Sequence, residues 1–326
     1  MLICERLWHI VSSYNRVIDF KYKKNLRKRV TIANNCGIIG RNRQKTDNMK
    51  STSNYGRFEI IDGKCVIPEG VLEIADHEFH SIHELHEIVI PNTVIRIGQD
   101  SFDSTGLGEI KIPDSVKIIE YGAFSSCFGL SKVELSESLV SIGDYAFSDC
   151  PIRSIKLPGT LTHLGRSSFG ASNLVSIHIP SSVVSIGHGA FSDCSELERI
   201  SVDENNPMYR SVSDTCLTKN GDTLVFGCKY SIIPKGVKYI GAESFEGCWG
   251  MESIEMPDSV THISYAAFSK CRNLKCVKLP KMLESIEKEA FGYCEKLVKP
   301  EIPSSVMNIA DDAFILPESG GDPLPF

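Results

Sequence analysis

The chain has 326 residues, of which 42% are apolar and 23% charged, a composition that excludes wholesale disorder. No run approaches the roughly 18 apolar residues of a membrane-spanning helix. The formal charge of -6 is unevenly divided, since residues 1–50 hold twelve Lys or Arg against three acidic residues, about +9, which leaves about -15 for the remainder. Because an acidic body repels phosphate, the sequence argues against nucleic-acid binding outside the first 50 residues.

Residues 1–50 form a basic arm whose most charged part is Lys21–Arg29. Glu5 and Arg6 interrupt its apolar start, so no secretory signal is readable and the sequence on its own favours the cytoplasm. Three interpretations stay open. The arm is a disordered tail, or the product of a translation start upstream of a real one at Met49, or a functional segment that binds anionic lipid, nucleic acid or a nuclear import factor.

From residue 68 onward the chain repeats itself about every 22 or 23 residues. The pattern is Pro-x-x-Val/Leu-x-x-Ile/Leu-x-x-x-Ala/Ser-Phe-x-x-Cys-x-x-Leu-x-x-Ile/Val-x-Leu/Ile. Each unit opens at one residue: Pro68, Pro91, Pro113, Ser136, Pro158, Pro180, Pro234, Pro257, Pro280 and Pro303. This period predicts a solenoid in which each unit buries its apolar positions against its neighbours, so no second globular core is required.

Each unit contains a predicted strand and a predicted turn. The segment with Leu130, Val133 and Leu135 alternates as a short strand does, and the next unit's opening Pro closes such a strand because it has no N–H to donate. We expect the strands to stack in parallel, with the Ala/Ser-Phe segment in a turn or short helical piece on the other side. One Phe per unit then forms an aromatic column: Phe124, Phe147, Phe191, Phe245, Phe268 and Phe291.

The ends of the array and one interruption have their own signals. Asp62-Gly63 suits a tight hairpin turn in a cap, and Asn220-Gly221 between apolar runs predicts an inserted β-hairpin. The expected segments, in chain order, are a basic arm at 1–50, an N-terminal cap at 51–67, repeats at 68–202, a hairpin insert at 203–233, repeats at 234–316 and a tail at 317–326.

Six of the twelve cysteines occupy one repeat position, three residues after the Phe: Cys127, Cys150, Cys194, Cys248, Cys271 and Cys294. We interpret them as a column of buried free thiols, because a small apolar thiol is among the most buried side chains. Neighbouring units lie about 4.8 Å apart, which is within disulfide reach, so the redox compartment stays open.

The strand register predicts which side chains point outward and could bind a partner. One column is Val89, Lys111, Glu134, Lys156, His178, Ser201, Glu255, Lys278 and Glu301, and the second is Glu87, Glu109, Lys132, Ser154, Ser176, Arg199, Ser253, Cys276 and Lys299. The mixed signs allow two interpretations. The columns are a self-complementary ladder, in which each pair contributes roughly 0.2 to 1 kcal/mol, or they form a surface that recognises a protein rather than a polyanion.

Catalytic chemistry is hard to find in this sequence. Four histidines recur three residues apart: His77, His80, His83 and His86. The helical piece should end before Leu85, which separates these ligands, and no column Cys has a distinguishing base, so we expect no metal, no cofactor and no catalytic residue. Phe128 and Trp249 follow the Cys column, and partial burial in the turn is favoured over a role as exposed binding anchors.

The repeat resembles that of the BspA-like leucine-rich repeat family over roughly residues 57–316. The resemblance rests on forms such as Ile112–Val116 and Gly143–Cys150, and the insert residues Val202–Tyr209 and Asn220–Asp222 are similar to a hairpin that interrupts many arrays of that family. The resemblance implies an α/β-type solenoid, curved and right-handed, with a parallel sheet on its concave side.

The resemblance also implies a non-enzymatic scaffold for protein recognition or adhesion, often at the cell surface. We therefore expect the concave sheet, possibly with the hairpin, to bind a protein partner. The alternative is that the basic arm tethers the chain to a membrane or nucleic acid, with the solenoid as a spacer.

Overall fold

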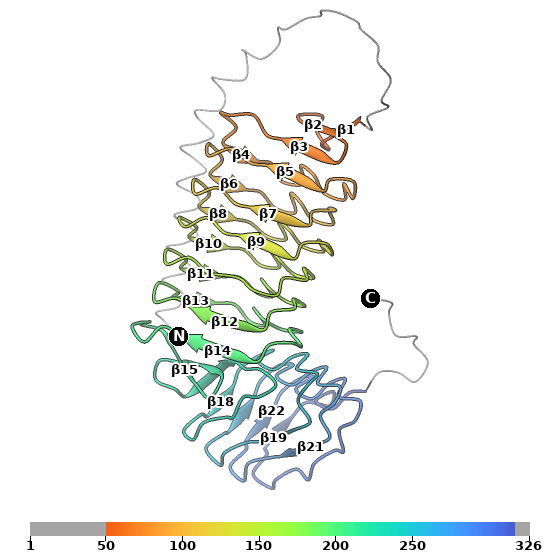
Figure 1. Cartoon of the computed structure of the whole chain (residues 1–326). Helices are drawn as coiled ribbons and strands as arrows, with labels where there is room; N and C mark the ends of the chain where they lie inside the picture. Colours follow the sequence, from red (N-terminus) through yellow and green to blue (C-terminus); the bar gives the residue numbers. More distant parts are fainter. Residues whose placement is uncertain (1–49, 317–326) are drawn as a thin grey trace, which may run out of the picture. The chain divides into compact units, whose positions relative to one another are not determined.

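A computed structural model describes residues 50–316, which belong to the compact unit Asn48–Phe326. The predictions for residues 1–49 and for the tail at 317–326 lie outside the described residues. The described chain is a β-solenoid in which most units contribute to two rows of short parallel strands (Figure 1). Residues 152–157 and 298–302, where the sequence also predicted strands, continue one row without a regular strand. The predicted parallel stacking is therefore confirmed.

The first row consists of the three- and four-residue strands that the Leu-x-x-Ile-x-Leu pattern predicted. It contains β5 (Glu87–Val89), β7 (Glu109–Lys111), β9 (Lys132–Glu134), β12 (Ser176–Ile179), β14 (Arg199–Val202), β19 (Ser253–Glu255) and β21 (Cys276–Lys278). Their apolar members point into the core and the alternate residues point outward, as a period of two requires. The outward side of this row is called the strand face below.

The second row consists of two-residue strands that follow each opening Pro. It contains β4 (Glu73–Ile74), β6 (Arg96–Ile97), β8 (Ile118–Ile119), β10 (Ser141–Ile142), β11 (His163–Leu164), β13 (Ser185–Ile186), β18 (Tyr239–Ile240), β20 (His262–Ile263), β22 (Ser285–Ile286) and β23 (Asn308–Ile309). Six of these strands form one parallel sheet before the insert, and the other four continue in a sheet after it. The pattern position that is always Ile or Leu supplies the second residue of each strand.

The Ala/Ser-Phe segments are turns, and the short helical pieces allowed by the sequence are wrong for residues 50–316. The residues two before and two after the Phe have positive φ, as at Tyr145 (57°) and Asp149 (58°) around Phe147. A right-handed helix cannot continue through such residues. The backbone bonds to the next unit instead, as where the N–H of Phe124 donates to the carbonyl of Ala146 (2.8 Å).

The predicted aromatic column runs along the core. Phe124 and Phe147 are stacked with their ring centroids 5.1 Å apart and their planes within 2°. The column passes from Phe191 to Phe226 of the insert (4.7 Å) and resumes between Phe245 and Phe268 (5.0 Å). All of these rings are buried, so the stack supplies the largest apolar side chains of the core.

Three strands cover the N-terminal end of the array: β1 (Lys50–Thr52), β2 (Glu59–Ile61) and β3 (Lys64–Val66). β2 and β3 pair antiparallel around Asp62-Gly63, and β3 then pairs in parallel with β5. Arg57 ties this end to the first unit through an ion pair with the fully buried Glu78 (2.8 Å). The arrangement removes the apolar end face that an uncapped stack would expose.

The insert holds three antiparallel strands rather than the two of a simple hairpin: β15 (Tyr209–Val212), β16 (Thr215–Thr218) and β17 (Thr223–Phe226). β16 and β17 flank Asn220-Gly221, the predicted turn, and the additional β15 is joined to β16 through Ser213-Asp214. Ser213 and Asp214 both have positive φ (50° and 54°). A Ser-Asp pair predicts a turn of this kind less strongly than Asn-Gly does. β17 pairs in parallel with β18 and so carries the second row onward.

The turn side of the solenoid bypasses the insert. The N–H of Asp193, before the insert, donates to the carbonyl of Glu246, after it (2.8 Å), and Arg166 pairs with Glu243 (2.6 Å). Gly189 permits this contact, because a Cβ at that position would overlap the Glu243 carboxylate. The insert therefore adds residues to the side of the solenoid that carries the strands and none to the side that carries the turns. The units after the insert are turned away from those before it (Figure 1).

Candidate functional site

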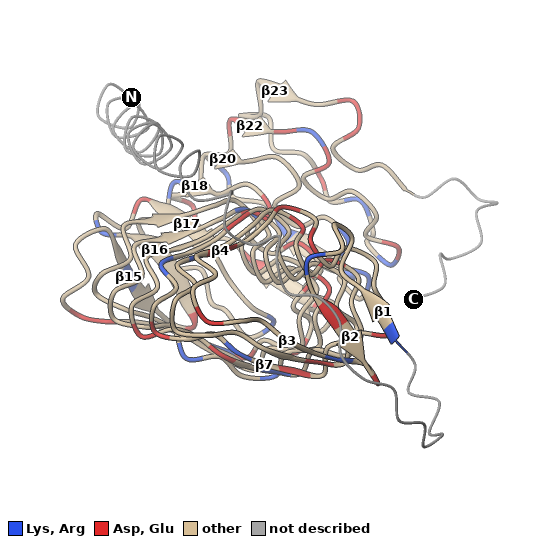
Figure 2. Ribbon diagram, turned by 90° about the horizontal axis from the view of Figure 1, so that it is seen from above, with Lys and Arg blue, Asp and Glu red and all other residues tan. Residues whose placement is uncertain are grey.

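The eight residues predicted to bind a partner all lie exposed on the strand face or its continuation. Period-two alternation and burial of the apolar neighbours fix their direction. These residues are Lys111, Glu134, Lys156, His178, Ser201, Glu255, Lys278 and Glu301. Around the solenoid as a whole, Lys and Arg are interspersed with Asp and Glu rather than segregated (Figure 2).

Toward the N-terminal half, the strand face carries ion pairs between neighbouring units. Lys132 lies 3.2 Å from Glu109 and 3.6 Å from Glu134, and Lys111 lies 3.9 Å from Glu134. The hydrogen bond and the charge of Glu109 raise the pKa of the Lys132 ammonium, which keeps it protonated. Such exposed pairs hold the register and contribute little to stability.

The C-terminal half of the strand face repeats this arrangement. Lys278 lies 2.6 Å from Glu255, and Lys275 lies 2.9 Å from Glu252. Lys156, by contrast, pairs with Glu137 (2.8 Å) and not with Glu134 in the neighbouring strand. Glu137 lies three residues after the end of β9. Both halves of the face are therefore largely neutralised by their own partners.

The middle of the strand face lacks these ion pairs. His178 and Ser201 share a hydrogen bond (3.0 Å), and Arg199 makes no ion pair with any residue in 50–316. Tyr230 and Ile232 are 62% and 69% exposed beside them. The sequence interpretation omitted these two residues because they lie in the insert, although they stand four and two residues before an opening Pro, as Ser253 and Glu255 do.

The cysteine column is buried, and the cysteines of residues 50–316 are free thiols. In this column, a thiol donates a hydrogen bond to the backbone carbonyl of the Phe in the preceding unit, as Cys150 does to Phe124 and Cys194 does to Phe169 (both 3.1 Å). Cys248, which comes after the insert, is the exception. Burial raises the pKa of the Cys194 thiol to about 11. Because the thiolate is the nucleophile, a thiol with so high a pKa is inert at neutral pH.

Alkylation distinguishes the buried column from the exposed thiol of Cys276. With iodoacetamide at pH 8, peptides of residues 50–316 from the native protein are expected to carry the label at Cys276 and to leave Cys194 and Cys248 unlabelled, because burial raises the pKa of both thiols. Unfolding in urea should expose every site to the reagent. Mass spectrometry of the labelled peptides measures this, and rapid native labelling of Cys194 would contradict the structural role of the column.

The four histidines that recur three apart do not converge. His77 lies 3.7 Å from Asp100, and His80 lies 3.0 Å from Asp103, a carboxylate of the next unit. His86 contacts the backbone carbonyl of Gly106 (3.1 Å). Within residues 50–316, no three His, Cys, Asp or Glu side chains form a group that could hold a metal ion.

The two aromatic residues after the Cys column differ in burial. Trp249 is half-buried, and the guanidinium of Arg272 lies 4.8 Å from its ring centroid. Phe128 is 75% exposed, so partial burial, which the sequence favoured, is wrong for this residue.

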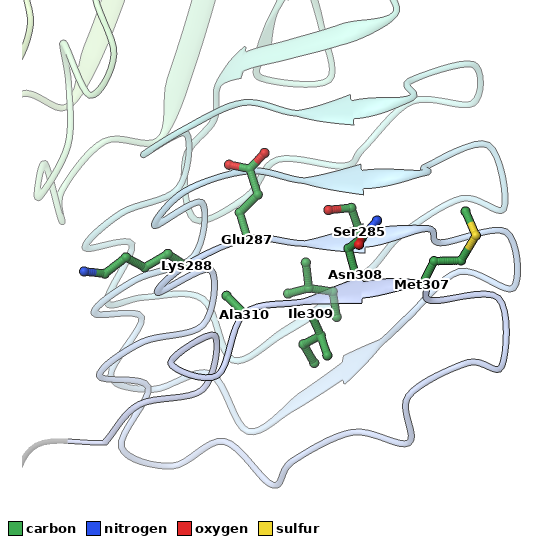
Figure 3. A pocket seen from close by; sticks show the side chains of 8 residues that line it. Ser285, Glu287, Lys288, Met307, Asn308, Ile309 and Ala310 are labelled. Atoms are coloured by element: carbon green, nitrogen blue, oxygen red, sulfur yellow. The ribbon is translucent and has the colours of Figure 1, made fainter.

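The hollow in Figure 3 lies at the end of the described array. It is lined by β22 and β23 together with Met307 and Ala310, and Ile309 is 45% exposed there because no further described unit covers it. In the part of the chain that the structure describes, no helix is long and apolar enough to cross a membrane.

Solved structures of bacterial leucine-rich repeat proteins share this fold. A leucine rich cell surface protein from Faecalibacterium prausnitzii A2-165 is 26% identical, with a TM-score of 0.61, over 83% of this chain and 86% of that chain. The pneumococcal vaccine antigen PcpA is 23% identical, with a TM-score of 0.60, over 81% of this chain and 62% of that chain. A leucine-rich repeat protein from Eubacterium ventriosum is 20% identical, with a TM-score of 0.55, over 82% and 95%. No curated protein matches the chain.

A family profile described as "BspA type Leucine rich repeat region (6 copies)" matches residues 34–130, 60–173, 117–220 and 226–316. Together these matches cover well over half of the chain. They agree with the spacing of Pro, Phe, Cys and Leu in the sequence and with the solenoid that this spacing produces. The chain therefore belongs to the BspA-type leucine-rich repeat family.

Proposed function

We propose that this solenoid is a non-enzymatic scaffold that recognises a protein partner through its strand face. The observation that carries the proposal is the row of exposed, mixed-charge side chains whose apolar neighbours are buried in two core clusters, one on each side of the insert. A rigid backbone fixes such side chains before binding, so less conformational entropy is lost on association. Mixed charge favours a protein partner over a polyanion.

The cell surface is the proposed location. The support is the name of the Faecalibacterium protein, which is described as a cell surface protein and resembles this chain over most of both lengths. Adhesion to another cell or to a matrix protein is one form of recognition that a surface location would allow. The insert contacts β14 of the strand face, where the N–H of Val202 donates to the hydroxyl of Ser211 (3.0 Å), so a partner bound there could also contact the insert.

Charge reversal on the strand face tests this function. The test is a quantitative pull-down from the source cells with the full chain as bait. The triple variant Lys111→Glu, Lys156→Glu and Lys278→Glu is expected to capture at least tenfold less of a specific partner than the parent protein does. The reason is that three rim charges change sign on one surface, each within reach of a bound protein.

The matched control reverses three lysines away from the strand face: Lys117→Glu, Lys238→Glu and Lys288→Glu. It carries the same change in net charge and should keep the partner. Circular dichroism before the assay establishes that both variants are folded. Equal partner retention by the two variants, or equal loss, would contradict recognition by the strand face.

The second candidate function is a tether made by the basic arm, and its support is the charge of about +9 on residues 1–50. In that case the full chain binds vesicles of anionic lipid, or DNA, in a salt-dependent way, and deletion of residues 1–48 removes the binding. Binding that survives this deletion would count against the tether.

A further inference from the structure

The outward side chains change character where the insert meets the strand face. On either side of this place, the exposed charges are paired, as Lys132 is with Glu109 and Lys278 is with Glu255. Between them lie Arg199, Tyr230 and Ile232, which have no such ladder. We call these three residues the mid-face cluster. Tyr and Arg are residue types that are enriched at binding hot spots, and Arg199 makes no ion pair with any of residues 50–316.

Contacts of the neighbouring backbone place the members of the cluster together. The thiol of Cys228 donates to the carbonyl of Glu198 (3.3 Å), and Lys229 pairs with the Glu198 carboxylate (3.1 Å). These contacts join the residues that directly precede Arg199 and Tyr230. The segment that carries Tyr230 therefore lies against the start of β14.

Asp214 of the insert bridges the same two segments. Its carboxylate accepts a hydrogen bond from the N–H of Ile200 (3.3 Å), and its carbonyl accepts one from the hydroxyl of Ser231. Ile232 in turn donates its N–H to the carbonyl of Ser213 (3.3 Å). The turn of the insert thus fills the space between β14 and residues 228–233 and holds both in place.

The segment that follows β17 buries some of its side chains and exposes others. Ser231 and Ile233 are buried, whereas Tyr230 and Ile232 are exposed. Tyr230 is a central residue of the turn that the N–H of Ser231 closes on the carbonyl of Cys228 (3.1 Å), and Ile232 follows this turn. The backbone contacts hold both side chains in position before any partner arrives.

We propose that the mid-face cluster is the specificity-determining centre of the strand face, and that it binds an extended protein segment carrying an aliphatic or aromatic side chain next to a carboxylate. The apolar side chain packs on Tyr230 and Ile232, and the carboxylate pairs with Arg199. An acidic partner fits this place, because Arg199 is a cation without an ion pair among residues 50–316, while the nearby Glu198 is already paired with Lys229. This inference rests on the proposed function of the strand face and deepens it.

A random 12-residue peptide library displayed on phage and selected on the immobilised full chain is the probe. Enriched peptides are expected to combine an acidic residue with Leu, Ile, Phe, Tyr or Trp at neighbouring positions. Synthetic versions should bind at least tenfold more weakly to the variant Tyr230→Ser with Ile232→Ser in calorimetry. Selection on Arg199→Glu should instead enrich peptides with a basic residue, because the sign of the unpaired charge is reversed.

Two controls keep the interpretation sharp. Arg153→Glu reverses another exposed Arg and should leave the acidic preference unchanged, and Phe128→Ser removes an exposed aromatic ring elsewhere and should leave affinity unchanged. Tyr230→Ser alone serves where the double variant fails to fold.

The outcomes separate this inference from the proposed function. Peptides that lose affinity for Lys111→Glu, Lys156→Glu and Lys278→Glu but not for the cluster variants would overturn the inference and leave the strand face as the site. Peptides that no strand-face variant weakens would overturn both. The absence of any peptide enriched above the uncoated support would also overturn the inference.

Discussion

Replacing Phe147 with Ala is expected to lower the free energy of unfolding by about 3 to 5 kcal/mol. Phe147 is fully buried and stacked between Phe124 (5.1 Å) and Phe169 (5.4 Å), so truncation leaves a cavity that two rigid neighbours cannot fill. A loss of this size is a large fraction of the 5 to 15 kcal/mol that stabilises a typical domain. Urea denaturation followed by circular dichroism measures it.

Phe128→Ala is the matched control, since it removes the same side chain from a position that is 75% exposed. We expect its free energy of unfolding to stay within about 0.5 kcal/mol of the parent. Because a repeat array can lose single units before the whole unfolds, hydrogen exchange around residues 124–169 should accompany the denaturation curve. Equal effects of the two substitutions would show that the stacked column is not what holds the units together.

Replacing Asn206 with Ala is expected to lower the free energy of unfolding by about 3 kcal/mol, because it removes four hydrogen bonds between a buried side chain and the backbone. The Asn206 side chain is fully buried. Its amide nitrogen donates to the carbonyls of Pro180 (2.7 Å) and Val183 (2.9 Å), and its amide oxygen accepts from the N–H groups of Met208 (2.9 Å) and Tyr209 (2.8 Å). One side chain therefore joins the entry of the insert to the preceding unit.

The readout for Asn206→Ala is hydrogen exchange together with thermal unfolding. Faster exchange is expected first at the amides of Met208 and Tyr209 and then along β15 and β16, with the units near the cap less affected. Asn205→Ala changes the exposed neighbour and should leave exchange unchanged. An Asn206→Ala protein with the parent's exchange rates would mean that other contacts hold the insert in place.

The sequence alone determined the repeat register and nearly everything that repeats with it. The spacing of Phe124 and Phe147 predicted a stack, that of Cys127 and Cys150 a buried column, and alternation in strands such as 132–134 the exposed columns. These features follow from a short unit that contacts its nearest neighbours, so local periodicity carries the tertiary information. The structure places these Phe and Cys columns in the core and the outward columns at the surface.

Hydrophobic spacing left the backbone conformation of the Ala/Ser-Phe segments open between a turn and a short helical piece, and the structure shows turns. The turns around Phe147 are not helical because Tyr145 and Asp149 adopt positive φ and bond to the next unit, and neither residue type demands that conformation as Gly would. The strand β15 was missed for a similar reason, since its turn at Ser213-Asp214 is a weak signal.

Tertiary structure alone decided what the insert does. Only the fold shows that Asp193 contacts Glu246 across more than 50 intervening residues, and that residues 228–229 contact Glu198, which precedes Arg199. The physical reason is that a periodic pattern specifies contacts between adjacent units, whereas an insertion breaks the period and its packing depends on shape and unpaired backbone groups. The repeats could therefore be predicted from the sequence, whereas the mid-face cluster could be identified only from the tertiary structure.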